Sequence, residues 1–192
     1  MYEPYLVVLT SISIYIFMLL NKNDMVLIKS NINQKHYPVH NLPDKQKACD
    51  MLAHIHEKLL KTTKYISRQN DIKFHKYTHD LDIKFKNTII QENEKLHPEK
   101  HLTSYNQDKG YKIVFCMRDI NTFKIYDENI IMYVALHELS HIACPEIGHP
   151  PLFVDIFTYV LKCAMAIGSW KHQNYALNPQ PYCGITINEH LV

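Results

Sequence analysis

The residues best suited to chemistry in this 192-residue chain are two histidines and a glutamate, His137, Glu138 and His141. On a helix, side chains four positions apart lie on one face, so both imidazoles can bind the same metal ion. Glu138 follows the first histidine directly, and its carboxylate can reach a water molecule on that ion. This H-E-x-x-H spacing is typical of zinc hydrolases, in which the glutamate acts as the general base.

A third histidine, His149, follows after a short loop, so the chain can turn back toward the first two. Three protein ligands and one open position are typical of a catalytic zinc site, whereas structural sites bind zinc through four ligands. We therefore expect His137, His141 and His149 to bind Zn²⁺ as neutral imidazoles. The ion would lower the pKa of its water to about 7, and Glu138 would accept the proton.

His75 and His79 have the same spacing, as do His97 and His101, but neither of these pairs has a glutamate directly after its first histidine. Only the 137–141 pair follows a long apolar, helix-like run, residues 130–136, which has Asp127 as its candidate N-cap. The alternative is a buried helix whose histidines only form hydrogen bonds. The glutamate and the third histidine together favour the metal site.

Further elements must position this motif. Pro150 and Pro151 suit the first turn of a second apolar helix. Apolar spacing predicts earlier helices at 44–66, beginning after Asp44, and near 80–95. We expect short strands at 25–28, 102–105, 111–118, 123–126 and 184–187, with a hairpin turn at 107–110. The expected fold class is α+β, with helices packed on a small mixed or antiparallel sheet.

Charge and cysteine content limit the function classes. The net charge is +2 and the lysines are spread along the chain, so there is no strong nucleic-acid signal. The five cysteines have irregular spacing and no C-x-x-C pair, which favours free thiols in a reducing compartment over a disulfide framework. Cys144 or Cys183 could approach the zinc and close its open position, although small buried thiols are the simpler interpretation.

The N-terminal residues 5–20 contain no charge and predict a transmembrane helix, a single-pass anchor over residues 1–21. Sixteen residues span about 24 Å of helix, so crossing the bilayer needs adjacent residues or local thinning. Lysines follow this run and a glutamate precedes it, so the positive-inside rule places the rest of the chain in the cytosol. Residues 22–43 would form a linker and residues 44–192 the domain. A buried core helix of a soluble protein is the alternative.

The segment from His137 to His141, with Gly148-His149 and Phe153 after it, resembles the minimal zincin metallopeptidases of the SprT-like and WLM groups. Those families place a third histidine soon after the motif helix and an aromatic residue in the next helix. Residues 42–187 also resemble uncharacterised zinc metallopeptidases of large nucleocytoplasmic DNA viruses. The matching motifs are Leu42-Pro43-Asp44-Lys45, Lys109-Gly110, the strand ending at Arg118, and Tyr182-Cys183-Gly184.

The resemblance implies a zincin-like minimal metallopeptidase domain that hydrolyses peptide bonds in a protein or peptide substrate. Zincins bind substrate along an exposed strand edge before the motif helix, and residues 111–118 are the candidate strand. Many such sites contain a second donor to the developing oxyanion. Tyr182 is the first candidate for that catalytic role and Tyr175 the second; a packed tyrosine with a surface hydroxyl is the alternative for both.

The expected function is that of a membrane-anchored, zinc-dependent metallopeptidase with Glu138 as general base. Its partners would be the substrate, the membrane through residues 5–20, and other virion or membrane proteins, at a virion inner membrane or the capsid. The alternative is a structural or virion-associated interaction protein on the same fold with little or no catalytic activity. Repair of protein–DNA crosslinks, a third hypothesis, is disfavoured because the chain has no zinc-ribbon cysteines or basic tail.

Overall fold

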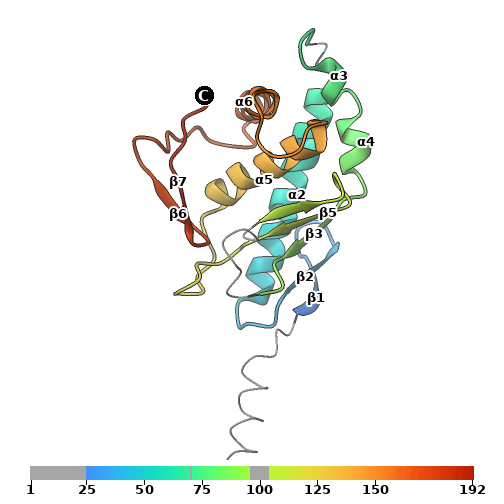
Figure 1. Ribbon diagram of the computed structural model, residues 1–192. Coiled ribbons are helices and arrows are strands. Elements are labelled where there is room, and N and C mark those ends of the chain that lie inside the picture. The colour runs from blue at the N-terminus through green and yellow to red at the C-terminus, as the bar shows by residue number, and fades with distance from the viewer. Residues whose placement is uncertain (1–24, 70, 96–103) are drawn as a thin grey trace, which may run out of the picture.

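A computed structural model of the chain describes residues 25–69, 71–95 and 104–192 (Figure 1). Its central element is the long helix α2 (Lys45–Ser67), which contacts strands from two sheets as well as the helices α4 (Leu81–Phe85), α5 (Glu128–Ala143) and α6 (Pro151–Ala166). A single turn, α3 (His75–Thr78), leads from α2 to α4. The expected α+β class is confirmed.

Helix α2 follows from apolar residues at helical spacing. Leu52, Ile55 and Leu59 have no exposed surface, and truncating one such side chain to alanine typically costs about 2–5 kcal/mol of stability. Asp44 precedes the helix as expected, but its carboxylate does not cap the first turn. It accepts a hydrogen bond from Arg118 Nη1 at 2.8 Å instead.

A three-stranded mixed sheet lies beside α2. Its order is β3 (Ile89–Glu92), β5 (Lys112–Phe115) and β4 (Tyr105–Gln107), with β3 parallel and β4 antiparallel to β5. Strand β5 is thus central and β4 lies at an edge. The turn expected at 107–110 connects β4 to β5.

The prediction of a helix near residues 80–95 is wrong for the second half of that range. Leu81 and Phe85 lie in the short helix α4, but Ile89 begins strand β3. Each of these three residues is four positions from the next, so the spacing alone fits a helix that continues through Ile89. The parallel pairing of β3 with β5, from a segment about twenty residues later, decides the outcome, because it satisfies backbone groups that a solitary helical turn would leave open.

Part of the stretch expected to be a linker, residues 22–43, is a β-hairpin. Strand β1 (Met25–Lys29) pairs antiparallel with β2 (His36–His40). Tyr37 and Val39 from β2 are buried in the same core as α2, and Ser30 Oγ donates to the Asp50 carboxylate at 2.8 Å. The folded unit therefore includes residues before position 44, because the hairpin has apolar side chains to bury.

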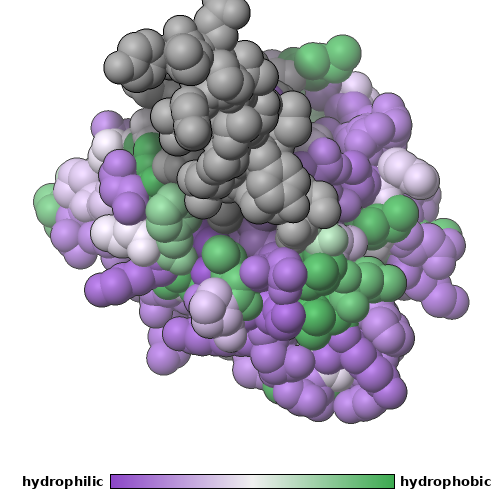
Figure 2. Space-filling view, turned by 90° about the horizontal axis from the view of Figure 1, so that it is seen from below, coloured by the Kyte–Doolittle hydropathy of each residue, from purple (hydrophilic) through white to green (hydrophobic). Residues whose placement is uncertain are grey.

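The expected membrane anchor, residues 1–21, lies outside the described residues. Among the residues that are described, no helix is both long and apolar enough to cross a membrane. The described surface seen from below in Figure 2 is largely hydrophilic, with smaller hydrophobic patches between the polar side chains.

The second half of the chain forms the two helices predicted around the histidines. The Asp127 carboxylate accepts from the Asn129 N–H at the start of α5, as an N-cap does. Helix α6 begins at Pro151, where the missing N–H costs nothing. After α6, the antiparallel hairpin of β6 (Gln180–Tyr182) and β7 (Ile185–Ile187) ends the described fold.

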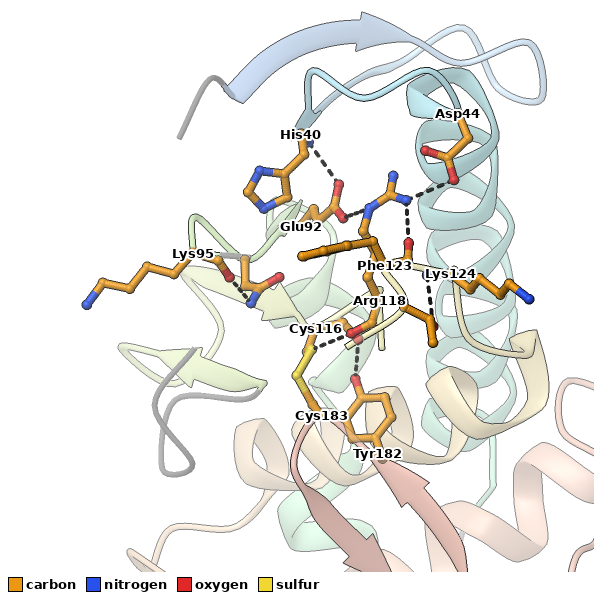
Figure 3. Close-up of polar contacts among 12 residues, drawn as sticks. His40, Asp44, Glu92, Lys95, Cys116, Arg118, Phe123, Lys124, Tyr182 and Cys183 are labelled. Atoms are coloured by element: carbon orange, nitrogen blue, oxygen red, sulfur yellow. Dashed lines mark hydrogen bonds and ion pairs between the residues drawn. A yellow bond between two sulfur atoms is a disulfide. The ribbon is translucent and has the colours of Figure 1, made fainter. Parts of the chain in front are cut away.

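The expectation of five free thiols is wrong for two of them. Cys116, directly after β5, is disulfide-bonded to Cys183 in the turn between β6 and β7, with the Cα atoms 6.3 Å apart (Figure 3). The two cysteines are 67 residues apart in the chain, so only the fold brings them together. Cys49, Cys144 and Cys163 are free and buried. Cysteine usage therefore no longer supports a reducing compartment.

Candidate metal centre

Three imidazoles meet at one point beside helix α5. His137 and His141 extend from the same face of α5, and His149 comes from the loop before α6. The Nε2 atom of His137 lies 3.2 Å from that of His141 and 3.0 Å from that of His149. The structure thus brings together all three histidines expected to be ligands, with their nearest nitrogens within 4.8 Å of one another.

This arrangement fits a zinc ion. Tetrahedral zinc with Zn–N distances of about 2.0–2.1 Å places its nitrogen ligands roughly 3.3–3.4 Å apart, close to the two distances from His137 Nε2 to the other imidazoles. Without a cation, His137 Nε2 would face two other ring nitrogens, although one lone pair can accept only one hydrogen bond. A cation at the centre satisfies all three nitrogens together.

Two phenylalanines of α6 hold the imidazoles in place. The Phe153 ring stacks on His141 with the centroids 4.2 Å apart, and the Phe157 ring meets His137 edge-on at 5.2 Å. Burial, with a smaller effect of the neighbouring imidazoles, lowers the pKa of His137 to about 3 and that of His141 to about 4. Both rings are therefore neutral at physiological pH, which is the state that binds a metal.

Glu138 lies on the inner side of the same helix turn and is only 5% exposed. Burial raises the pKa of its carboxyl to about 8, against the opposing effect of a hydrogen bond from the Asn106 backbone. A base whose pKa lies near the working pH is well matched to proton transfer. The geometry therefore gives Glu138 the environment of a general base and not that of a solvated surface carboxylate.

The centre opens into a groove made of two cavities. One, of about 430 Å³, runs along β4 and includes Tyr105, Asn106 and Lys109. The other, of about 290 Å³, lies between α5 and the β6–β7 hairpin. Both cavities share the same four lining residues, Ser104, His137, Glu138 and His149.

The strand expected to present its edge to substrate, residues 111–118, is not at an edge. Strand β5 within it is paired on both sides, by β3 and by β4. In the described part of the chain, the edge strand next to the histidines is β4, whose residues Tyr105 and Asn106 line the larger cavity. The sequence pattern selected the most apolar strand, and such a strand is usually central because it is buried on both faces.

Two residues that the sequence reasoning did not assign to the site, one in β4 and one in the β4–β5 turn, connect this part of the sheet to α5 and the loop after it. Lys109 Nζ donates to the carbonyl oxygens of Cys144 and Glu146, at 2.8 and 2.9 Å, beyond the end of the helix. Asn106 Nδ2 donates to the Glu138 carbonyl at 3.1 Å. The motif Lys109-Gly110 had marked this turn only as a point of resemblance.

The proposed oxyanion donor Tyr182 lines the smaller cavity, but its hydroxyl is buried and already bonded. It donates to the Cys116 carbonyl at 2.8 Å and lies 2.9 Å from Ser104 Oγ. Tyr175, the second candidate, packs against Tyr133 with ring centroids 4.8 Å apart and is fully buried. Neither hydroxyl is at the surface.

Neither cysteine considered as a fourth zinc ligand belongs to the cluster. Cys183 is bonded to Cys116 and has no thiolate to offer. Within the described residues, the candidate metal group around the histidines contains no cysteine, so Cys144 is also outside it. Among the described residues, therefore, no cysteine joins the three histidines as a fourth ligand.

The described fold and site define an α+β protein with an H-E-x-x-H candidate metal centre. The chain belongs to the viral protein family that includes Uncharacterized protein R325 of Acanthamoeba polyphaga mimivirus, to which it is 37% identical over 174 residues. The match covers 89% of this chain and 86% of that protein.

Shorter matches occur in two invertebrate iridescent viruses. The chain is 39% identical over 90 residues to Uncharacterized protein 042R of Invertebrate iridescent virus 3, covering 46% of this chain and 50% of that protein. It is 36% identical over 59 residues to Uncharacterized protein 136R of Invertebrate iridescent virus 6, covering 30% of this chain and 33% of that protein. No family model matches the chain.

Among solved structures, Wss1 from Saccharomyces cerevisiae superposes with a TM-score of 0.43 and 19% identity, over 66% of this chain and 83% of that one. A likeness of this size establishes neither a shared family nor a shared activity.

Proposed function

We propose that this protein is a zinc-dependent metallopeptidase. The observation that carries the proposal is the convergence of three imidazoles beside a buried carboxyl, Glu138, inside an open groove. A structural zinc site would need neither the glutamate nor the groove and would normally have a fourth protein ligand.

The chemistry follows from the residues around the centre. Zinc bound by His137, His141 and His149 would polarise a substrate carbonyl and acidify a water molecule. Glu138 accepts the proton from the attacking water and returns it to the leaving amine. Hydrogen bonds from Asn106 and Lys109 hold α5 and the loop after it against β4 and the turn that follows β4.

The substrate would be an extended peptide that pairs with the open edge of β4. Main-chain hydrogen bonds to an edge strand supply affinity without dependence on sequence. Tyr182 remains our proposal for a second donor to the carbonyl oxygen. To act in this way, its hydroxyl has to leave the Cys116 carbonyl, so Tyr182 would contribute only after the substrate has displaced that bond.

The test is cleavage of an unfolded protein by the zinc-loaded full chain. Glu138→Gln should bind the same amount of zinc and lose at least about 100-fold in kcat, in line with the contribution of a general base. Glu94→Gln, at an exposed glutamate just after β3 and outside both cavities, is the matched control and should cleave normally. Equal cleavage by the parent and Glu138→Gln would refute the proposal.

We further propose that residues 5–20 attach the protein to a membrane with the domain on the cytosolic side, where it would act on virion or membrane proteins. This rests on the uncharged N-terminal run and the lysines that follow it. Flotation of the full chain with lipid vesicles tests the attachment. Recovery of the protein in the lipid-free fraction would contradict it.

A further inference from the structure

The β6–β7 hairpin is fastened to the domain through its turn. Both turn residues, Cys183 and Gly184, have positive φ, 50° and 81°, as a two-residue type I′ turn requires. Cys183 is disulfide-bonded to Cys116 at the end of β5, and its N–H donates to Tyr126 Oη at 2.7 Å. Tyr182, the residue before the turn, donates to the Cys116 carbonyl (Figure 3). These links fix where the hairpin lies.

This hairpin forms one wall of the smaller cavity, and α5 forms the other. Val134 lies one turn before His137 on the same face of α5 and lines the cavity. Ile185 and Ile187 of β7 line the opposite wall, together with the uncharged polar side chains of Thr186 and Asn188. Among the described residues, no lysine or arginine lines it, and the exposed Glu189 is its only carboxylate besides the buried Glu138.

The cavity is placed to receive the side chain next to a reacting carbonyl. His137, Glu138 and His149 line both this cavity and the groove along β4. A peptide paired with β4 that brings one carbonyl to the centre therefore has a neighbouring side chain at the mouth of the smaller cavity. At about 290 Å³ the cavity can hold one large side chain, whereas whole small-molecule ligands usually occupy roughly 300–1,000 Å³.

We infer that this cavity is the subsite that selects an apolar side chain beside the scissile bond, and that the Cys116–Cys183 disulfide holds the wall that shapes it. The inference rests on the proposed peptidase function. Apolar walls favour an apolar guest because its burial removes hydrocarbon from water, and the absence of a cationic lining residue gives an acidic side chain no partner.

The first test uses peptides that differ only in the residue on either side of the cleaved bond. The full-length, zinc-loaded protein should cleave a leucine peptide at least about 10-fold faster, in kcat/KM, than the alanine, lysine and aspartate peptides at one of these positions. Equal rates for leucine and alanine, or a preference for a charged residue, would overturn the inference.

A second test changes the wall. Ile185→Asp is expected to reduce the leucine-over-lysine preference by at least about 10-fold, because a carboxylate then faces the guest. Ile185 is 42% exposed in the fold, so the variant should remain folded. Leu177→Asp is the matched control, since Leu177 is 85% exposed and lies outside both cavities. An unchanged preference in Ile185→Asp would contradict the inference.

The role of the disulfide is tested with the double variant Cys116→Ser/Cys183→Ser. It should retain bound zinc, because the ligands lie on α5 and in the loop before α6, and should raise KM for the leucine peptide several-fold more than it lowers kcat. Loss of zinc, or an unchanged KM, would show that the disulfide does not act through the subsite.

Peptide binding separates the inference from the proposed function. Zinc-loaded Glu138→Gln can be titrated with the same fluorescent peptides, and the leucine peptide should bind at least about 10-fold more tightly than the alanine peptide. Selective binding without cleavage by the parent would refute the peptidase function but not the subsite. Cleavage without selectivity would refute the subsite alone, and the absence of both would refute the two together.

Discussion

Lys109 Nζ lies 2.8 Å from the carbonyl oxygen of Cys144, the residue that ends helix α5. The ammonium group thereby satisfies a carbonyl that the helix leaves open, at the negative end of the helix dipole. The same ammonium group donates to the carbonyl of Glu146, which lies in the loop that carries His149. A side chain from the β4–β5 turn thus fixes the position of the third metal ligand.

Replacement of this lysine should weaken zinc binding. In Lys109→Met the loop before His149 loses its anchor, and outer contacts of this kind are worth roughly 10–100-fold in metal affinity. Competition with a chromophoric chelator measures the dissociation constant. Lys61→Met, on the exposed face of α2, is the control. An unchanged affinity in Lys109→Met would show that the loop holds His149 without help.

Removal of one partner of a buried ion pair should strongly destabilise the folded state. Arg118 is 4% exposed and donates through Nε to Glu92 Oε1 at 2.7 Å, while Glu92 has no exposed surface (Figure 3). Arg118→Met leaves the Glu92 carboxylate buried without its cation, which should cost about 3–5 kcal/mol in the free energy of unfolding. Urea denaturation measures the change.

The double variant Arg118→Met/Glu92→Gln checks the cause. With the buried charge removed, it should regain a large part of the lost free energy of unfolding, although the contacts of Arg118 with Asp44 and the Phe123 carbonyl stay broken. If the double variant is as unstable as Arg118→Met, the loss comes from packing and not from the unpaired charge.

His56 should make the stability depend on pH. Its ring is buried against Tyr37, whose hydroxyl lies 2.7 Å from Nδ1, and burial lowers the pKa of His56 to about 4. Because the unfolded chain binds a proton below about pH 6.5 and the folded chain does not, stability falls as the pH drops from about 6.5 to 4.

The slope due to one such histidine is at most about 1.4 kcal/mol per pH unit. Urea denaturation at several pH values, with and without His56→Gln, isolates it from the other histidines. The variant should be less stable near neutral pH but should lose less stability on acidification. Parallel pH profiles for the parent and the variant would contradict this assignment.

The sequence was sufficient where local patterns decide the structure. Asp127 and Pro151 mark the starts of α5 and α6, and the H-E-x-x-H spacing places two histidines on one helix face whatever surrounds that helix. The same periodicity could not separate the end of α4 from β3, because Ile89 fits either and only pairing with β5 decides.

Features that form between segments far apart in the chain could not be predicted from the sequence. The Cys116–Cys183 bond joins positions 67 residues apart, and nothing in their spacing distinguishes them from the three free cysteines. The open edge of β4 depends on the order of the strands, which no single strand encodes. Lys109 looks like any surface lysine until the turn is folded against α5.

The most direct test of the central claim is the content and coordination of the metal in the full-length protein. Elemental analysis should find one zinc per chain, and X-ray absorption should show three imidazole nitrogens and one oxygen, with no sulfur. His149→Ala should lose most of the zinc. An absence of zinc, or a sulfur ligand that completes a closed site, would contradict the account of a catalytic centre built on His137, His141 and His149.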